Sequence, residues 1–189
     1  VKNTIEVLAS NLLACDSRII IYSDAPKKSD DNDRVTSVRK YLSTVHGFKS
    51  VEVIERKENM GLANNIIDGV TAVSNKYGKV IVLEDDILTS KYFLSYMNDA
   101  LRIFEDNKKV MQIGGYTYPF DKTGLPESFF LKKADCWGWG IWRDRWQLFE
   151  RDTEKMIRST TKDEIYKINM DGKTYYWSQI LDNRDGTLN

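Results

Sequence analysis

The chain has 189 residues, its 28 Lys and Arg are balanced by 28 Asp and Glu, and 41% of its residues are hydrophobic. This length suits a single domain with a full hydrophobic core, and the composition excludes a disordered tail, a collagen and a coiled coil. A formal net charge of zero argues against a nucleic-acid partner, because a binder that relies on a general basic field would be positive.

Two further features bear on location. Cys15 and Cys136 are the only cysteines. They are too few for a disulfide scaffold or a structural zinc site, which favours a reducing compartment and hence the cytoplasm. No apolar run approaches the roughly 20 residues that a membrane-spanning helix needs, and no signal-peptide pattern opens the chain. The sequence therefore predicts no transmembrane segment, and it leaves peripheral contact with the inner face of a membrane open.

Apolar side chains alternate between two kinds of spacing along the first 116 residues. Helical spacing predicts helices over residues 1–15, from the acidic cluster at 30–33 to about 45, over 62–77 and over 90–104. Gly78 is expected to end the third helix as a left-handed cap, and Ser90 is expected to cap the start of the fourth. Between them lie short apolar runs without polar alternation, at 18–22, 51–54, 80–83 and 110–113. Such runs are typical of strands buried on both faces of a parallel sheet. The alternation predicts an α/β fold, with an open, mostly parallel sheet and helices on both faces.

The pattern changes after Tyr116. Prolines and glycines mark a loop, a short strand is expected at Phe129–Leu131, and an aromatic-rich stretch follows. We therefore divide the domain into an α/β part, residues 1–116, and an aromatic-rich extension of the same domain, residues 117–189. Because a first helix on a parallel sheet normally follows a strand, we also expect a central strand upstream of Val1.

Polar residues follow each predicted strand, where ligands of open α/β sheets bind. They are Asp24, the stretch from Arg56 to Gly61, Glu84–Asp86, and Tyr116. The strongest signal is the acidic triad Glu84, Asp85 and Asp86. Adjacent carboxylates repel one another, and Mg²⁺ or Mn²⁺ would offset that repulsion while leaving positions open for phosphate. The alternative interpretation is an acidic turn that faces solvent.

The stretch Asn59–Asn65 is the second candidate. Gly61 permits a close approach of the backbone, and the amides at the start of a helix suit a phosphate or a ring carbonyl. An Asn before a helix is, however, often only a cap. Arg56 is a candidate phosphate partner, although an isolated Arg is more often a solvated surface residue.

The third candidate is the segment Cys136–Trp142, in which Trp137 and Trp139 are flanked by glycines. Aromatic faces stack on the apolar patches of sugar rings. The alternative is a small aromatic core. Asp171, in the polar last segment, is either solvated or a general base. The lone His46 gives no support to a triad mechanism.

Four segments occur in an order that resembles a known family: Asn59–Ala63, Val80–Asp86, Phe93–Met97 and Cys136–Trp139. The chain resembles the nucleotide-sugar-dependent glycosyltransferases with the GT-A fold. It is similar to the bacterial family-two-like enzymes of polysaccharide biosynthesis and to the branch that contains N-acetylglucosaminyltransferase I. The resemblance covers most of the chain from Asp24 to Trp146, and it implies a first strand of the sheet before Val1.

The resemblance also implies residue roles. Asp24 would contact the nucleotide base or ribose, and Asn59–Leu62, with Gly61, would line the uridine pocket. Asp86 would ligate Mn²⁺ or Mg²⁺, while Glu84 and Asp85 would hold ribose and water. The implied enzyme moves a sugar from a donor such as a UDP-sugar to a hydroxyl of a glycan acceptor, with inversion. A catalytic base is expected beyond the aromatic segment, where Asp171 is our candidate.

Two other functions stay open on the residues alone. A carbohydrate-binding module would use the tryptophans and would bind sugar regardless of chelators. A sugar-phosphate nucleotidyltransferase would use a glycine-rich, basic phosphate loop near its start. A transferase, in contrast, predicts metal-dependent nucleotide affinity.

Overall fold

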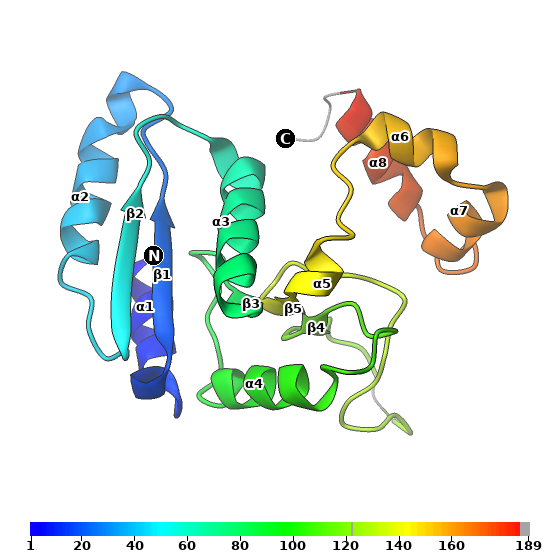
Figure 1. Ribbon diagram of the computed structural model, residues 1–189, viewed down its shortest axis with the longest axis horizontal. Helices are drawn as coiled ribbons and strands as arrows, with labels where there is room; N and C mark the ends of the chain where they lie inside the picture. Colours follow the sequence, from blue (N-terminus) through cyan, green and yellow to red (C-terminus); the bar gives the residue numbers. More distant parts are fainter. Residues whose placement is uncertain (122, 186–189) are drawn as a thin grey trace. The chain divides into compact units, whose positions relative to one another are not determined.

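A computed structural model describes residues 1–121 and 123–185, and it has a mixed α/β fold (Figure 1). The chain forms two compact units: Val1–Thr117 with Asp135–Gln147, and Tyr118–Ala134 with the chain from Leu148 onward. Within the described ranges, no helix combines the length and the apolar composition required to cross a bilayer.

The first sheet of the first unit has two parallel strands. β1 (Arg18–Ser23) pairs with β2 (Ser50–Glu55), and Ile19 lies opposite Val51. The elements around them are α1 (Lys2–Ala9), the 3₁₀ turns η1 (Ala14–Asp16) and η2 (Ser29–Asp31), and α2 (Asn32–Leu42). Both strands were expected from their β-branched residues. The first helix is shorter than expected, and Leu12, beyond its end, is exposed.

A long helix connects the two sheets of this unit. α3 (Gly61–Tyr77) ends at Gly78, whose φ of 82° is the left-handed cap conformation predicted from the sequence. β3 (Lys79–Val82) follows directly. In Figure 1, α3 lies between the β1–β2 pair and β3. The contacts agree, because α3 packs on β3 and Gly69 of α3 lies against the Tyr22 ring of β1.

The second sheet is antiparallel, with the strand order β3–β5–β4. β5 (Trp139–Trp142) pairs with β3 on one side and with β4 (Ile113–Gly114) on the other. Sequence reasoning missed β5, because its tryptophans and glycines were interpreted as a ligand-binding segment. The α/β class is therefore confirmed, but the described strands form two small sheets, and β3 and β4 do not pair with each other.

Helices cover both faces of this second sheet. On one face, Val70 of α3 packs with Trp139 and Ile141. On the other, α4 (Phe93–Ile103) packs its apolar side chains against Trp142. The glycine at position 140 allows close packing, because a Cβ there would lie 3.0 Å from the Met97 side chain and 3.1 Å from that of Leu101 and would displace them by a few tenths of an ångström. The side chains of β5 thus alternate between the two helices.

Two polar side chains fix the ends of α4. Asn11, which is buried, accepts a hydrogen bond from the Leu94 amide, 83 residues away in sequence. At the other end, the buried Arg145 of α5 (Arg143–Trp146) donates to the carbonyls of Phe104 and Glu105. The predicted cap at Ser90 is wrong. The residue at the N-cap position of α4 is Tyr92, and its side chain makes no capping hydrogen bond.

The second unit is helical where it has regular structure. It contains α6 (Thr153–Ser159), α7 (Lys162–Ile168) and α8 (Tyr176–Arg184). The Lys133 ammonium lies over the rings of Tyr118 and Tyr176, which links the 118–134 loop to α8. The strand expected at Phe129–Leu131 does not form. Without a neighbouring strand, these apolar residues have no ladder of hydrogen bonds to join.

Candidate functional site

Asp24 follows β1 and anchors the loop that precedes α3. Its carboxylate accepts hydrogen bonds from the amides of Met60 and Gly61, both at 2.9 Å, and from the Asn59 side chain at 3.1 Å. Asn59 also donates to the Ala25 carbonyl at 2.6 Å. The structure therefore brings together Asp24, Asn59 and Gly61, three of the residues predicted for nucleotide binding. The first amides of α3 are bound by a carboxylate of the protein itself.

The electrostatics of Asp24 follow from these contacts. Burial by itself raises the pKa of the carboxyl, but hydrogen bonds from neighbouring amides, led by that of Met60, outweigh burial and hold the pKa below its ordinary value. Asp24 is therefore ionised at neutral pH. An anionic phosphate at the same amides would meet a negative charge, so the loop suits a neutral, hydrogen-bonding group such as a base or a ribose better.

Gly61 and Leu62 form the turn into α3. Gly61 has a φ of 72°, and no atom lies within 4 Å of the position of a Cβ. The need for glycine is therefore in the backbone and not in a lack of space. Leu62 is 66% exposed. Its side chain is available to a ligand, and it does not contribute to the apolar stripe of α3 as the helical spacing predicted.

Arg56 follows β2 and is held by three neighbours. Its guanidinium donates to Asn65 Oδ1 at 2.9 Å, pairs with Asp68 and lies 4.9 Å from the centre of the Tyr22 ring. Arg56 is thus an ordered side chain and not the solvated surface residue of the alternative interpretation. A phosphate would have to compete with Asp68 for this guanidinium.

The carboxyl ends of β1 and β2 face the same direction, because the two strands are parallel. Short loops join α3 to β2 before it and to β3 after it. A helix of 17 residues spans about 25 Å, so α3 carries the chain from the end of β2 to the start of β3. The Asp24 loop after β1 therefore lies at the end where α3 begins, and the acidic triad follows β3.

The acidic triad forms a turn directly after β3. The Asp85 carbonyl accepts hydrogen bonds from the Thr4 hydroxyl at 2.6 Å and from the Val1 amino group at 2.7 Å. The side chains of Asp85 and Asp86 are exposed, whereas Glu84 is half-buried. Burial, reinforced by the charges of Asp86 and Asp85, raises the pKa of the Glu84 carboxyl.

These carboxylates fit a cation that arrives with a ligand better than a resident structural metal. Burial and the charges of Asp86 and Asp85 raise the pKa of the Glu84 carboxyl, and the Val1 amino group lies 3.9 Å from Asp85 Oδ2. Yet among the described residues, no three acidic, histidine or cysteine side chains are grouped so as to enclose a metal ion. Mg²⁺-type cations are commonly held by one or two carboxylates together with substrate phosphates. Such an arrangement would need only Asp86 and one neighbour.

Trp137 and Tyr116 form an exposed aromatic pair at the same end of the second sheet. Their ring centres are 4.9 Å apart at an interplanar angle of 65°, and Trp137 is 44% exposed. Val82 of β3 and Gly114 of β4 both lie opposite Trp139 of β5. Trp137 precedes Trp139 by two residues, and Glu84 and Tyr116 follow Val82 and Gly114 by two residues. Because β5 is antiparallel to β3 and β4, all three lie at the same end of the sheet. The triad and the aromatic pair are therefore at the same strand ends.

Trp139 has a different environment. It is only 7% exposed and packs with Val70, Ile141 and Trp146. Its indole N–H has no hydrogen-bond partner among the described residues. Burial favours the core interpretation for Trp139 over stacking on a sugar, whereas the exposure of Trp137 keeps that residue available for a ligand.

Asp171, the candidate base, belongs to the second unit. It is exposed and lies between α7 and α8. Its φ of 56°, and that of 52° at Met170, are left-handed values that are uncommon outside glycine. Gly172, which follows, also has a left-handed φ, of 80°. The turn projects the Asp171 carboxylate into solvent, where it is accessible to a reactant.

Sequence reasoning missed Arg39 of α2. Its guanidinium donates to the carbonyls of Asp24 at 3.2 Å and Arg56 at 2.9 Å and forms an ion pair with Glu55 at 3.2 Å. In the sequence, Arg39 is one of several basic residues on an amphipathic helix. Only the three-dimensional path of the strands reveals which of them reaches the strand ends.

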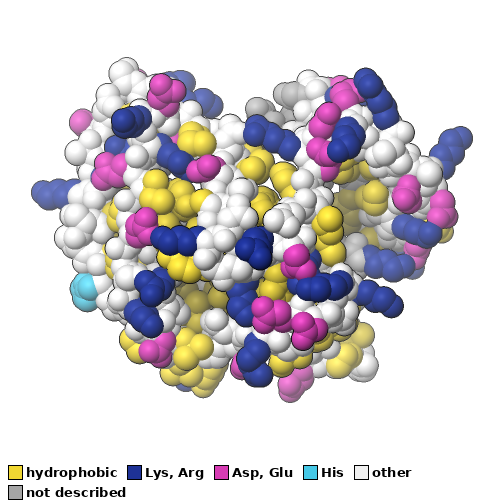
Figure 2. Space-filling model, in the orientation of Figure 1, with side chains coloured by type: hydrophobic (Ala, Val, Ile, Leu, Met, Phe, Trp, Pro, Cys, Tyr) yellow, Lys and Arg dark blue, Asp and Glu magenta, His cyan; other side chains and the backbone are white. Residues whose placement is uncertain are grey.

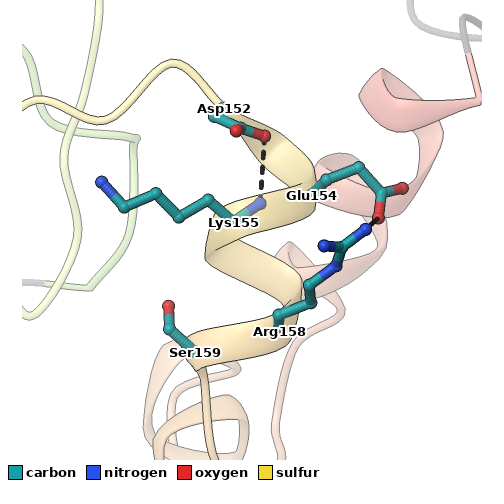
Figure 3. Close-up of a pocket in the computed structure, with 5 residues that line it drawn as sticks. All are labelled: Asp152, Glu154, Lys155, Arg158 and Ser159. Atoms are coloured by element: carbon teal, nitrogen blue, oxygen red, sulfur yellow. Dashed lines mark hydrogen bonds and ion pairs between the residues drawn. The ribbon is translucent and has the colours of Figure 1, made fainter.

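A separate depression lies on the surface of the second unit (Figure 3). It has a volume of about 450 Å³ and is lined by five residues of α6 and its cap: Asp152, Glu154, Lys155, Arg158 and Ser159. Asp152 accepts from the Lys155 amide at 3.0 Å, and Glu154 pairs with Arg158 at 3.6 Å. The charges compensate one another along a single short helix, so this depression does not indicate a ligand.

Comparison with models of protein families, with curated proteins and with solved structures found no match to this chain.

Proposed function

We propose that this chain is a metal-dependent glycosyltransferase of the GT-A type, which moves a sugar from a nucleotide-diphosphate donor to a hydroxyl of a glycan acceptor with inversion. The observation that supports this most is the arrangement at the strand ends. Asp24 and Asn59, which follow β1 and β2, are joined by a hydrogen bond, and the Glu84–Asp86 triad follows β3, which the proposed fold makes parallel to β1 and β2. A binding site for a nucleotide diphosphate needs a loop that binds the base and a turn that binds the cation, and the Asp24–Asn59 contact and the acidic triad are the candidates for these two parts.

The donor occupies these strand ends in the proposal. Asp24, Asn59, Gly61 and Leu62 contact the base and ribose of a donor such as a UDP-sugar, and Glu84 and Asp85 bind ribose and water. Asp86 is the protein ligand of Mn²⁺ or Mg²⁺. When bound, the cation neutralises charge on the departing diphosphate. Arg56 binds phosphate only after the Asp68 contact is exchanged.

The acceptor lies on the aromatic side. Trp137, with Tyr116 beside it, offers an exposed ring surface for a sugar. A carboxylate then removes the proton of the attacking hydroxyl, and Asp171 is the proposed base. Attack from the side opposite the departing diphosphate inverts the configuration at the sugar carbon.

The fold expected of this enzyme class is also part of the proposal. Among the described strands, β1 has a neighbour on one edge only, and so does β3. Both are apolar, yet most of their residues are only half-buried, in contrast to the fully buried β5. Because α3 touches both strands, we place one further parallel strand between them. It would join the two sheets into one open, mostly parallel sheet.

The two cysteines are the basis for a proposal on the cellular compartment. Cys15 and Cys136 are both exposed, and two cysteines are too few for a disulfide scaffold, which suits a reducing compartment. We therefore place the activity in the cytoplasm, including the inner face of a membrane.

A thermal-shift panel tests the proposed function. Nucleoside diphosphates, UDP-sugars and free oligosaccharides are compared, each with Mn²⁺ and with EDTA. We expect stabilisation by UDP or a UDP-sugar in Mn²⁺ only. Stabilisation by oligosaccharides that EDTA does not alter would instead identify a carbohydrate-binding module, which the exposed Tyr116–Trp137 pair also suits. Preference for a nucleoside triphosphate and a sugar phosphate would identify a nucleotidyltransferase.

A further inference from the structure

Arg39 of α2 gathers the main-chain carbonyls at the ends of two strands. Its guanidinium donates to the carbonyls of Ser23 at 3.4 Å, Asp24 at 3.2 Å and Arg56 at 2.9 Å. It also donates to the Ser23 hydroxyl at 3.4 Å and pairs with Glu55 at 3.2 Å. Its side chain is 24% exposed, so these contacts are partly shielded from water.

These contacts begin where the ladder between the strands ends. The Arg56 amide donates to the Ser23 carbonyl at 2.9 Å, beyond the last paired residues, Ser23 and Glu55. From there the two chains separate into different loops. The planar guanidinium, with several donors in fixed directions, is the group that continues to connect them.

Asp24 links the Arg39 guanidinium to the start of α3. Its carbonyl is bound by Arg39, while its carboxylate is bound by the amides of Met60 and Gly61. Fixing the Asp24 backbone therefore fixes the direction of its side chain, and that side chain in turn fixes the loop. Each step is a hydrogen bond to a charged group, the stronger kind in proteins.

We propose that Arg39 is a positioning residue for the nucleotide side of the site. It acts through Asp24 and keeps Asn59 and Gly61 in the arrangement that receives the base and ribose. The ligand part of this inference rests on the proposed function. The positioning of the loop does not, because it concerns contacts within the chain alone.

Amide hydrogen exchange tests the positioning without any ligand. Arg39→Ala is compared with Arg34→Ala, which removes the same charge from an exposed position of the same helix. We expect the amides of Met60 and Gly61 to exchange at least about tenfold faster in Arg39→Ala, with little change at Ile20 or Val53 in the strands. Unchanged exchange at 60–61, or equal acceleration throughout β1 and β2, would overturn the proposal.

Arg39→Lys supplies the second variant. It keeps the charge and the fold of α2 but offers one ammonium in place of the planar fork. We expect its exchange at residues 60 and 61 to resemble that of Arg39→Ala. If Arg39→Lys instead exchanges like the wild type, the charge alone is sufficient and the role assigned to the guanidinium geometry is wrong.

Titration with UDP in Mn²⁺ then tests the consequence for binding. We expect Arg39→Lys to weaken UDP affinity at least about fivefold, while Arg34→Ala binds like the wild type. Wild-type affinity in Arg39→Lys, despite faster exchange at 60–61, would overturn the link between positioning and binding. Absence of UDP binding in the wild type would reject the proposed function, and the exchange experiment would still decide the positioning role.

Discussion

The Asp24 carboxylate is bound on both oxygens by groups of the protein itself. The Asn59 side chain and the Gly61 amide donate to Oδ2, and the Met60 amide donates to Oδ1. A ligand contact by Asp24 therefore has to share these oxygens or follow a rearrangement of the loop. At the residue scale, the first role of Asp24 is to shape the site, and direct contact with a nucleotide is a second role that depends on the first.

Asp24→Asn should lower the free energy of unfolding by about 1–2 kcal/mol at pH 7, because charge-assisted hydrogen bonds to Met60 and Gly61 are lost. The pKa of Asp24 is lower in the folded protein than its ordinary value of 3.8. Its stabilisation is therefore fully present above about pH 4 and is lost as the pH falls through the folded pKa.

Urea unfolding at several pH values measures this effect. The difference between the wild type and Asp24→Asn should shrink progressively as the pH falls below about 4, because protonation then removes the charge of the wild-type carboxylate. Asp106→Asn, an exposed position in the same unit, is the matched control and should change stability little at any pH. A difference for Asp24→Asn that does not depend on pH would refute the anchoring role of the charge.

The two neighbouring tryptophans should respond differently to truncation. Trp139→Ala should cost about 3–5 kcal/mol of stability, because its ring is buried against Val70 and Ile141. Trp137→Ala should cost less than about 1 kcal/mol, because the ring is 44% exposed, and should weaken binding of a UDP-sugar or of an acceptor glycan. Denaturant unfolding beside ligand titration measures both effects. Similar losses of stability in the two variants would show that Trp137 is a core residue and would contradict its role in ligand binding.

At the scale of elements, local sequence patterns correctly predicted the strands and helices that short stretches of the chain specify by themselves. β1, β2, β3 and α3 appear where β-branched runs and helical spacing place them, and Gly78 ends α3 as predicted. α4 also forms, but its start is fixed by Asn11, 83 residues away. No sequence window contains such a partner, which explains why the cap was assigned to Ser90.

β5 shows the opposite case. Its residues, Trp139–Trp142, include a glycine and have no β-branched residue except Ile141. Trp and Ile favour strands, but Gly140 and the flanking Gly138 weaken the strand pattern, because glycine is depleted from strand interiors. The segment is a strand because two neighbours, β3 and β4, pair with its two edges and two helices cover its faces. Tertiary packing, which a single sequence does not display, decided this element.

The free edges of β1 and β3 give a prediction at this scale. Among the described strands, β1 pairs only with β2 and β3 only with β5. In the 189 residues by themselves, without the further strand proposed between β1 and β3, amides on the outer edges should exchange with solvent, and alternate residues along Arg18–Ser23 should be poorly protected. The amides of Gly140 and Ile141 in β5, between two strands, should be well protected. Residue-resolved hydrogen exchange measures this, and uniform protection along β1 would show that both its edges are already paired.

At the scale of the whole molecule, the order of the sequence placed the candidate residues at strand ends, and hydrogen bonds join Asp24 with Asn59 and Gly61. The pairing of β3 with β5 puts the acidic triad and Trp137 at the same end of the second sheet, and their role in binding a nucleotide sugar stays a prediction. The functions of Arg39 and Arg56 depend on contacts between separate elements, so sequence reasoning missed the first and could not position the second. Asp171 lies in a second unit, and its role as the base stays a prediction.

The central claim is that the acidic triad binds a cation together with a nucleotide diphosphate. Calorimetric titration of UDP into the wild type, Asp86→Asn and Asp106→Asn, in Mn²⁺ and again in EDTA, tests it most directly. The wild type and Asp106→Asn should bind UDP in Mn²⁺ only. Asp86→Asn, which keeps the shape but loses the charged ligand, should bind at least about tenfold more weakly, a difference of about 1.4 kcal/mol. Equal affinities in Asp86→Asn and the wild type, or affinities that EDTA does not change, would contradict this account.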